Sequence, residues 1–295
     1  ALWNIGVVYL DLNVPEVLLG ITLILLVTGI ISYKNSTSLS EYPTRASVLE
    51  SFKTISDENL DRIDNEIEIK DIGHVPRREA NRILEGIQDE DNLDKFIVKG
   101  KGGVGKSGIL KKVCEECYHD ILFIDASTAP AITSEEKLID ELSLEAPLER
   151  CVRQARVKEP LVVIFDQLDD TDRQAGETYK QLILDIAQIE DVSTIFACRT
   201  YELENYDEFA ALEDSPHFGS PVTVSTLSKT KARDFLEELG ISSPSPDLAR
   251  LCREIEYLDV VARLVEDGAN LDHVTDEVEV WDEYRRLIAE DHPSE

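Results

Sequence analysis

A glycine-rich stretch at residues 99–107, KGKGGVGKS, carries the clearest chemical signal in the sequence. It contains the pattern G-x-x-x-x-G-K-[ST], whose glycines allow backbone N–H groups to surround a phosphate. The amine of Lys106 can reach the β- and γ-phosphates of a nucleotide, and the hydroxyl of Ser107 can ligate Mg²⁺. A short apolar run precedes the loop and a helical pattern follows it, as this motif requires. We therefore predict that ATP or ADP binds with Mg²⁺ through Gly100, Lys101, Gly102, Gly103, Val104, Gly105, Lys106, Ser107 and Gly108.

Lys101 raises a question about the type of loop. The letters KGGVGKS resemble the deviant loop of MinD/ParA-type ATPases, in which an extra lysine acts across a dimer. Alternatively, Lys101 is a solvated residue at a variable position of an ordinary loop. That group carries its loop near the N-terminus and a later strand ending in D-x-x-G or D-x-P. Here 99 residues precede Gly100 and QLDD follows Asp166, so the sequence favours an ordinary loop.

A second pattern, LVVIFDQLDD at residues 161–170, is an apolar strand that ends in carboxylates. The first carboxylate after such a strand lies at the carboxyl edge of the sheet, beside a phosphate-bound Mg²⁺. We predict that Asp166 and Ser107 hold this metal, and that Asp169 or Asp170 orients or deprotonates the attacking water. The two acids also fit a solvated helix start, where the helix dipole favours negative charge. The sequence does not distinguish between Asp169 and Asp170.

A third pattern, STIFACRT at residues 193–200, brings Arg199 to the same edge of the sheet. A guanidinium there can contact a γ-phosphate, although an arginine at a strand end is otherwise an ordinary surface residue. Because the loop and the acidic strand precede it, we interpret Arg199 as a sensor of the γ-phosphate. The predicted catalytic residues are Lys106, Asp166, Asp169, Asp170 and Arg199.

The order of these motifs resembles the STAND class of P-loop ATPases, which includes the NACHT and NB-ARC proteins and is related to the AAA+ ATPases. The NACHT pattern D-G-x-D-E is similar to DQLDD here, with Gln167 in place of the small residue and Asp170 in place of glutamate. The resemblance covers roughly residues 74–290 and suggests a prokaryotic member. It implies a slowly hydrolysing nucleotide switch in signalling or defence, with a further protein partner that supplies a sensor or effector. It also implies that the segment VPRREANRI, with Val75 and Arg77, packs near the adenine.

The alternation of elements predicts the fold. Short apolar runs at 96–98, 121–125, 161–166, 193–199 and 221–224 alternate with helical patterns, whereas only helical patterns follow residue 226. This predicts an α/β fold: a P-loop NTPase with a central parallel five-stranded sheet flanked by helices. We expect the P-loop ATPase domain over residues 74–226 and a small all-helical subdomain over 227–295, which the resemblance to STAND ATPases implies is a lid. The polar residues 34–73 are expected to form a linker and a stalk helix.

The N-terminal region, residues 1–33, contains a long apolar run. Residues 17–33, VLLGITLILLVTGIISY, carry no charged side chain and can just span a bilayer as a helix. We predict a single transmembrane helix over about residues 15–33. Basic residues follow this run rather than precede it, which predicts a cytoplasmic ATPase domain on a single-pass membrane protein. The alternative is a buried helix of a soluble fold; a cleavable signal peptide fits less well because its basic region is missing.

The charge balance limits the possible partners. The chain has 60 acidic and 30 basic residues, a formal net charge of -30, and this surface repels nucleic-acid backbones. Nucleic-acid binding is therefore not expected, and an acidic surface suits a salt-rich cytoplasm and a halophilic source. The five cysteines form no disulfide framework, and the isolated pair Cys114 and Cys117 is typical of a half-buried helix rather than a metal site.

Three functions are compatible with these features. The first is a membrane-anchored, Mg²⁺-dependent ATP switch with ATP-dependent self-association. The second is a MinD/ParA-type ATPase that dimerises at a membrane through Lys101. The third is a scaffold that binds nucleotide for stability without hydrolysing it. The motifs favour the first, and the absence of an N-K-x-D stretch favours ATP over GTP.

Overall fold

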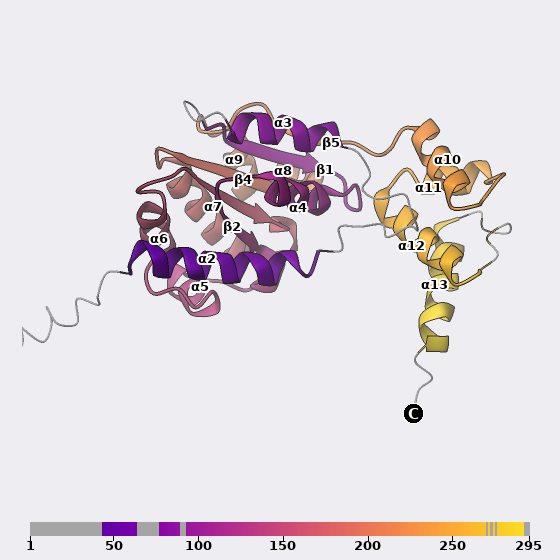
Figure 1. Ribbon diagram of the computed structural model, residues 1–295, viewed down its shortest axis with the longest axis horizontal. Helices are drawn as coiled ribbons and strands as arrows, with labels where there is room; N and C mark the ends of the chain where they lie inside the picture. Colours follow the sequence, from indigo (N-terminus) through magenta and orange to yellow (C-terminus); the bar gives the residue numbers. More distant parts are fainter. Residues whose placement is uncertain are drawn as a thin grey trace, which may run out of the picture. The chain divides into compact units, whose positions relative to one another are not determined.

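The computed structural model describes residues 43–63, 77–88, 93–269, 271, 274 and 276–291. Arg45–Glu295 forms one compact unit, and its centre is a parallel sheet (Figure 1). The strands are β1 (Phe96–Gly100), β2 (Asp120–Asp125), β3 (Leu161–Asp166), β4 (Val192–Arg199) and β5 (Val222–Val224). Their order across the sheet is β2-β3-β4-β1-β5, and every neighbouring pair is parallel. The predicted five-stranded parallel sheet is confirmed.

Strand β4 lies between the strand that carries the glycine loop and the strand that ends in acids. Gly100 of β1 is aligned with Arg199 of β4, while Phe165 near the end of β3 is aligned with Phe196. Because all the strands run in one direction, their carboxyl ends meet at one edge of the sheet. The end of β4 therefore lies between the glycine loop and Asp166.

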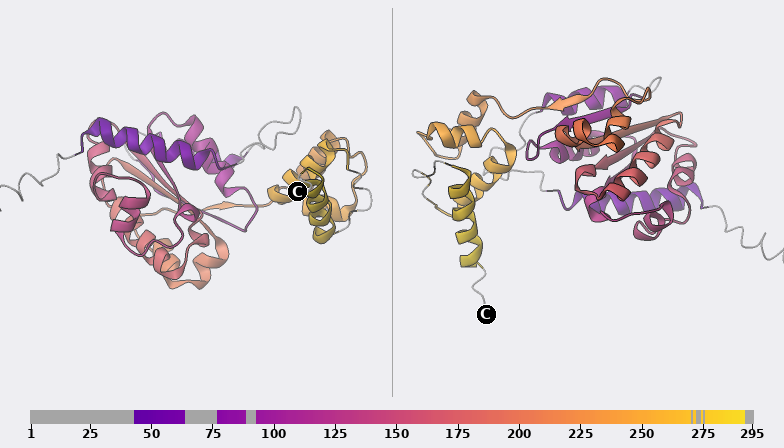
Figure 2. Two further views of the ribbon diagram at one scale, coloured as in Figure 1. Left: turned by 90° about the horizontal axis from the view of Figure 1, so that it is seen from below. Right: turned by 180° about the vertical axis from the view of Figure 1, so that it is seen from behind.

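Helices cover both faces of the sheet, which explains why its strands are almost uniformly apolar (Figures 1 and 2). Strand β3, for example, is buried at all of its positions. On one face α3 (Arg78–Ile87) and α4 (Lys106–Glu116) pack against the sheet, with Ile83 and Leu110 fully buried. The predicted flanking helices are thus present on this face.

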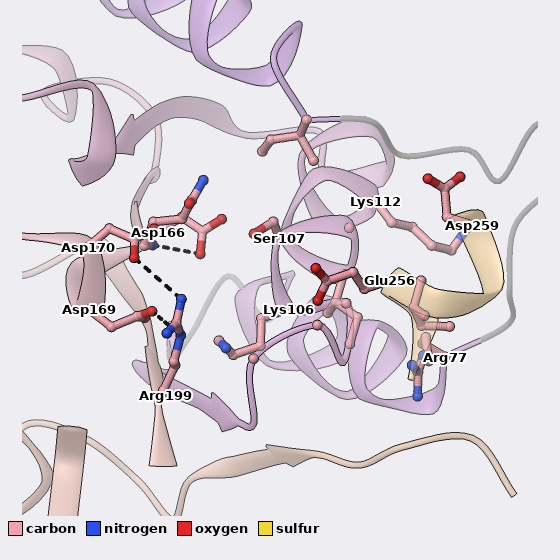
Figure 3. A pocket seen from close by; sticks show the side chains of 18 residues that line it. Arg77, Lys106, Ser107, Lys112, Asp166, Asp169, Asp170, Arg199, Glu256 and Asp259 are labelled. Atoms are coloured by element: carbon pink, nitrogen blue, oxygen red, sulfur yellow. Dashed lines mark hydrogen bonds and ion pairs between the residues drawn. The ribbon is translucent and has the colours of Figure 1, made fainter. Parts of the chain in front are cut away.

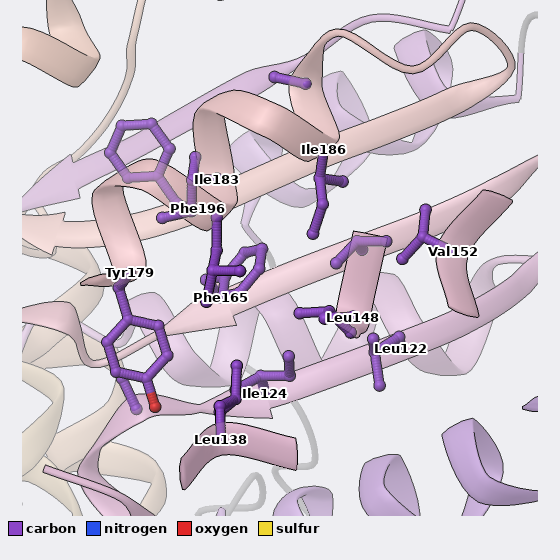
Figure 4. Packing of buried hydrophobic residues seen from close by; sticks show 14 of the residues in the cluster. Leu122, Ile124, Leu138, Leu148, Val152, Phe165, Tyr179, Ile183, Ile186 and Phe196 are labelled. Atoms are coloured by element: carbon purple, nitrogen blue, oxygen red, sulfur yellow. The ribbon is translucent and has the colours of Figure 1, made fainter. Parts of the chain in front are cut away.

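The opposite face carries the largest hydrophobic cluster (Figure 4). It is covered by α5 (Glu135–Glu141), α6 (Leu148–Ala155) and α7 (Arg173–Ala187). The ring of Tyr179 on α7 meets Phe165 of β3 edge-on, with the ring centroids 6.3 Å apart. Burying one such aromatic side chain contributes about 2–3 kcal/mol, so this face fixes the position of β3 and the acids that follow it.

Helix α2 (Arg45–Leu60) covers the open edge of the sheet at β2. Its buried Phe52 joins the large cluster. The Ser56 hydroxyl accepts from the backbone N–H of Phe123 and donates to the carbonyl of Ile121, and the Asn59 amide donates to the carbonyl of Phe123. These bonds satisfy backbone groups that an edge strand otherwise leaves unpaired. The predicted stalk helix is therefore wrong for residues 45–60, because α2 belongs to the sheet domain, which begins well before residue 74.

Short elements follow the strands at the carboxyl edge of the sheet. The 3-10 turn η1 (Ala126–Thr128) follows β2, and η2 (Leu168–Asp170) follows β3. Helices α8 (Thr200–Asn205) and α9 (Asp207–Glu213) follow β4. These turns and helices place the polar residues that follow β2, β3 and β4 at the carboxyl edge of the sheet.

After β5 the described chain is helical and has its own hydrophobic cluster. Its helices are α10 (Lys229–Glu238), α11 (Pro246–Leu251), α12 (Ile255–Glu266) and α13 (Glu277–Asp291). The hydroxyls of Ser228 and Ser245 cap the first two of these helices by accepting from backbone N–H groups. Figure 1 shows these helices in orange to yellow.

No helix among the described residues is both long enough and apolar enough to cross a bilayer. The apolar run at residues 17–33 lies outside the described residues, so the transmembrane helix stays a prediction.

Candidate functional site

The glycine loop between β1 and α4 is shaped by backbone conformations that favour glycine. Gly103 has φ +68° and Gly105 has φ +90°, both in the left-handed region. A Cβ on Gly100 would lie 2.6 Å from the carbonyl oxygen of Val224, so β5 closes tightly against the loop. Helix α4 begins at Lys106, and its free N–H groups and positive dipole end favour a bound anion.

Lys106 is held over this loop by main-chain oxygens. Its Nζ donates to the carbonyl of Lys101 at 3.0 Å and lies 3.5 Å from that of Gly100. Both contacts are to neutral groups, so the amine is available to a phosphate. The side chain of Lys101, in contrast, is exposed and does not line the cavity described next.

A cavity of about 330 Å³ lies at this edge of the sheet (Figure 3). The loop, η2, the end of β4 and the start of α12 all contribute to its wall. Its lining residues are Ile63, Arg77, Gly102, Gly103, Gly105, Lys106, Ser107, Gly108, Ile109, Lys112, Asp166, Gln167, Asp169, Asp170, Arg199, Ile255, Glu256 and Asp259.

Asp166 is the most deeply buried acid of the cavity, with 1% of its surface exposed. Burial raises its pKa to about 6, while hydrogen bonds from the Ser107 hydroxyl and the Gln167 backbone N–H, and the charge of Lys106, oppose that rise. The backbone bond joins Gln167 N to Asp166 Oδ1 at 2.9 Å. The other oxygen, Oδ2, is buried and has no hydrogen-bond partner. A buried carboxylate with one unsatisfied oxygen beside a serine hydroxyl is suited to a cation.

Asp169 and Asp170 differ in their surroundings. The side chain of Asp169 is 5% exposed and that of Asp170 is 41% exposed. Asp169 Oδ2 accepts from Arg199 Nε at 2.6 Å, whereas Asp169 Oδ1 is buried without a partner. Burial raises the pKa of Asp169, and the charges of Lys106 and Arg199 oppose this. Figure 3 shows Arg199 pointing toward both acids.

Arg77 supports the loop through hydrogen bonds to main-chain carbonyls. Its guanidinium donates to the carbonyl of Val104 at 2.7 Å and to that of Ser225 at 2.8 Å. Burial lowers its pKa. Arg77 thus ties the loop to the end of β5, a role different from the predicted contact with adenine, although it also lines the cavity. Val75, the other residue predicted to lie near adenine, falls outside the described residues.

The start of α12 contacts the loop directly. The backbone N–H of Glu256 donates to the carbonyl of Gly103 at 3.2 Å. A Cβ on Gly103 would collide with the Glu256 carboxylate, and one on Gly105 would lie 3.4 Å from Ile255. The absence of side chains in the loop therefore also allows α12 to approach it.

Most of the predicted site residues meet in this cavity. The loop residues Gly102, Gly103, Gly105, Lys106, Ser107 and Gly108 line it together with Arg77, Asp166, Asp169, Asp170 and Arg199. Gly100, Lys101 and Val104 do not line it. Val104 instead fills the core beneath the loop, where it is 1% exposed.

Several lining residues were not anticipated. Ile63 comes from the end of the α2 region, which the sequence suggested was a stalk, and Ile255 and Glu256 come from α12. Only a folded chain brings these distant residues to the loop, so no local signal identifies them. Asp125 is a different case, because it follows the apolar run of β2 as Asp166 follows that of β3. The strand-end argument applied to Asp166 also identifies Asp125 as a residue of this edge.

No protein-family model matches the sequence, and no curated protein matches it. The chain is similar in structure to the ORC1 protein of Aeropyrum pernix, solved in complex with DNA, with 15% identity, TM-score 0.46, and coverage of 74% of this chain and 67% of that one. It is also similar to a Walker-type ATPase of Pyrococcus abyssi, with 17% identity, TM-score 0.49, and coverage of 73% of each chain. A third similar structure is Cdc6p of Pyrobaculum aerophilum, with 12% identity, TM-score 0.46, and coverage of 70% and 66%.

These likenesses are too distant to carry an argument about function. The assignment of the fold depends instead on features of the chain itself. A parallel five-stranded sheet, a glycine loop that leads from β1 into α4, and a strand-end acid beside Ser107 define the fold of a P-loop NTPase. The chain has this fold.

Proposed function

We propose that the protein is a slow, Mg²⁺-dependent ATPase that uses the bound nucleotide as a switch. One arrangement carries this proposal: the cavity joins an anion-binding helix start, Lys106, the Ser107–Asp166 pair and a second buried acid, Asp169. Phosphoryl transfer requires these groups, because it depends on positioning and on stabilisation of negative charge. ADP would bind the same loop after hydrolysis.

The residues at the metal position fit Mg²⁺. The partnerless Oδ2 of Asp166 and the Ser107 hydroxyl would supply two oxygens to Mg²⁺, an ion that prefers oxygen ligands and binds together with substrate phosphates. Across the described residues no cluster of three or more metal-binding side chains is present, which agrees with a metal that binds together with its nucleotide. When bound, the ion would neutralise charge on the phosphates.

Asp169 is better suited than Asp170 to position the attacking water. Its Oδ1 is buried and partnerless, so it can accept a hydrogen bond from water, whereas the side chain of Asp170 is 41% exposed and already contacts Arg199. Burial also raises the pKa of Asp169, which makes its carboxylate a stronger base than an exposed aspartate. We assign water activation to Asp169, and an auxiliary contact with Arg199 to Asp170.

Lys106 and the N–H groups at the start of α4 would stabilise the phosphates, and Arg199 would contact the γ-phosphate. The side walls of the cavity, formed by Ile63, Ile109 and Ile255, are apolar and suited to one face of a base. The sequence lacks the N-K-x-D stretch that selects guanine, so the base assigned here is adenine.

The switch is supported by the contact between α12 and the loop. Glu256 bonds to Gly103, and both residues line the cavity. A nucleotide in the cavity would therefore lie against the start of α12. A ligand that binds one arrangement of α12 better than another shifts the balance between them. The motif order resembles STAND ATPases, so we place the protein among signalling or defence switches that self-associate in ATP and act with another protein. A prokaryotic, halophilic source agrees with the acidic composition.

We also propose attachment to a membrane through residues 17–33, with the ATPase domain in the cytoplasm. The uncharged run and the basic residues that follow it support this. Sedimentation of the full chain with vesicles tests it. A Leu25→Lys change, in the middle of the run, should release the protein, and continued co-sedimentation would contradict the assignment.

Phosphate release by the full chain tests the enzymatic function. We expect slow ATP turnover that requires Mg²⁺, is lost in EDTA and is weaker with GTP. Binding of ATP without phosphate release would instead favour a nucleotide-stabilised scaffold. The specific observation that would favour a MinD/ParA-type dimer is loss of turnover on removal of the Lys101 amine.

A further inference from the structure

Gln167, the residue after Asp166, has a backbone conformation that side chains rarely adopt. Its φ of +55° and ψ of +37° lie in the left-handed region. A residue with a Cβ pays about 1–2 kcal/mol in this region, so a glutamine here needs a compensating contact.

That contact reaches the neighbouring strand. Gln167 Nε2 donates to Asp125 Oδ2 at 3.1 Å, which links the turn after β3 to the end of β2. Asp125 is 3% exposed, and its Oδ1 accepts from the backbone N–H and the hydroxyl of Ser127, at 2.9 and 2.6 Å. Three donors, the amide of Gln167 among them, therefore fix the orientation of the Asp125 carboxylate.

Gln167 also influences the positions of Asp166, which precedes it, and of Asp169, which follows two residues later. Its backbone N–H donates to Asp166 Oδ1, and its ψ angle sets the direction in which the chain enters η2. Asp169 lies in the middle of η2, and Leu168, the residue before it in the sequence, is fully buried. A change of the Gln167 conformation would therefore turn η2 and move the Asp169 carboxylate within the cavity.

We propose that Gln167 and Asp125 are positioning residues for hydrolysis: their side-chain hydrogen bond holds the strained turn that presents Asp169 to the water. This inference rests on the proposed ATPase function. Neither residue needs to touch the nucleotide for this role. Loss of the bond should reduce the rate of the chemical step and leave ATP binding, which depends on the loop and α4, nearly unchanged.

Q167A is the most informative variant. Alanine keeps a Cβ in the left-handed conformation, so this change removes the amide and leaves the strained turn without its compensating contact. We expect kcat to fall at least ~10-fold and the Kd for ATP to stay within about twofold. A kcat equal to that of the unchanged protein would overturn the proposal. Gln181 provides a matched control, because its amide also donates to an aspartate, Asp185, but on the exposed face of α7; Q181A should leave kcat unchanged.

A reversed pair tests the contact itself. Q167E places two carboxylates together and should lower kcat more than Q167A does. In the double variant D125N/Q167E the introduced asparagine amide can donate to the introduced glutamate, while its oxygen still accepts from Ser127. We expect the double variant to recover most of the lost kcat. Activity no higher than that of Q167E would contradict the proposal.

Unfolding separates this inference from the proposed function. If the unchanged protein binds ATP but releases no phosphate, the proposed hydrolysis is refuted. The hydrogen bond between Gln167 and Asp125 can still be tested by urea denaturation of Q167E, D125N and D125N/Q167E. The contact is supported if the urea midpoint of the double variant is higher than the value obtained by adding the two single effects. Additive midpoint shifts would overturn it whether or not the protein hydrolyses ATP.

Discussion

Arg199 Nε lies 2.6 Å from Asp169 Oδ2, and the same guanidinium reaches Asp170 Oδ1 at 3.4 Å. The residue proposed to sense the γ-phosphate is thus paired with the residue proposed to activate water. A γ-phosphate carries more negative charge than a carboxylate and competes for the guanidinium. Nucleotide binding is therefore expected to release Asp169 from this pair.

Removal of Arg199 should reduce the preference for ATP over ADP. In R199A the contact with the γ-phosphate is lost, while the loop still holds the other phosphates. We expect the ratio of ADP and ATP dissociation constants to fall ~10-fold, as for the loss of a charged hydrogen bond, with ADP affinity unchanged. Calorimetric titration of both nucleotides measures this. R250A, at an exposed arginine of α11, is the control, and an unchanged ratio in R199A would remove Arg199 from the γ-phosphate site.

The two acids of η2 should differ in their effect on turnover. D169N should lower kcat by ~10²-fold with ATP still bound, because the partnerless Oδ1 loses its charge. D170N should lower kcat by no more than a few-fold, since its side chain is far more exposed than that of Asp169. Single-turnover phosphate release gives both rates. The reverse order of effects would transfer the proposed role to Asp170.

The two lysines of the loop should also differ in their effects on ATP binding and turnover. K106A removes the amine above the loop and should abolish ATP binding, whereas K101A removes an exposed side chain that does not line the cavity. We expect K101A to keep most of the turnover, measured over a range of protein concentrations. A loss equal to that of K106A, together with turnover that depends on protein concentration, would indicate a lysine acting across a dimer.

Asp166 should make the metal-free protein less stable at high pH. Its pKa is about 6 in the folded protein, above the ordinary value of 3.8, so the fold binds this proton more tightly than the unfolded chain does. The contribution, roughly 3 kcal/mol in total, is complete below the unfolded pKa of about 3.8 and is lost as the pH rises through about 6. Roughly 1.4 kcal/mol of it is lost between pH 5 and pH 8. Thermal unfolding in EDTA at pH 5 and pH 8 measures it.

D166N is the matched variant for that measurement, because it removes the titration. The difference in Tm between pH 5 and pH 8 should be smaller in D166N by about 3–6 °C, since roughly 1.4 kcal/mol is lost over this range and 1 kcal/mol corresponds to about 2–4 °C for a chain of this size. Other acids titrate in both proteins and cancel in this comparison. Equal differences in the two proteins would show that Asp166 has an ordinary pKa.

Asn59 should contribute to the stability of the sheet. N59A leaves the buried carbonyl of Phe123 without its donor and should lower the free energy of unfolding by about 1–3 kcal/mol. T54A, which alters an exposed threonine on the same helix, should change it by less than about 0.5 kcal/mol. Urea denaturation distinguishes the two. Equal small effects would mean that α2 does not hold the edge of the sheet.

The sequence predicted the parts of the fold that depend on local patterns. The apolar runs identified all five strands, because a strand buried on both faces has little choice of composition. Glycine spacing located the loop, and strand-end acids located Asp166. These signals need no knowledge of distant contacts.

The wrong prediction of a stalk helix has a physical cause. The polar composition of residues 34–73 predicts a linker and a stalk helix, and even the buried face of α2 includes the polar residues Ser56 and Asn59. They are polar because they bond to the backbone of β2, a partner that is about 65 residues away in sequence. Arg77 lines the cavity, and its bonds to the carbonyls of Val104 and Ser225 are likewise contacts that the sequence does not indicate. Tertiary hydrogen bonds of this kind leave no periodic signal.

The covering of β2 by α2 bears on how self-association should be measured. A chain shortened to begin at residue 74, the domain boundary suggested by the motifs, would leave the backbone of Ile121 and Phe123 open to solvent. An open edge pairs readily with the same edge of another molecule, which leads to aggregation through strand addition. Such a fragment would form oligomers without nucleotide and could be mistaken for a constitutively active switch. Only a chain that retains Arg45–Leu60 can reveal assembly that depends on ATP.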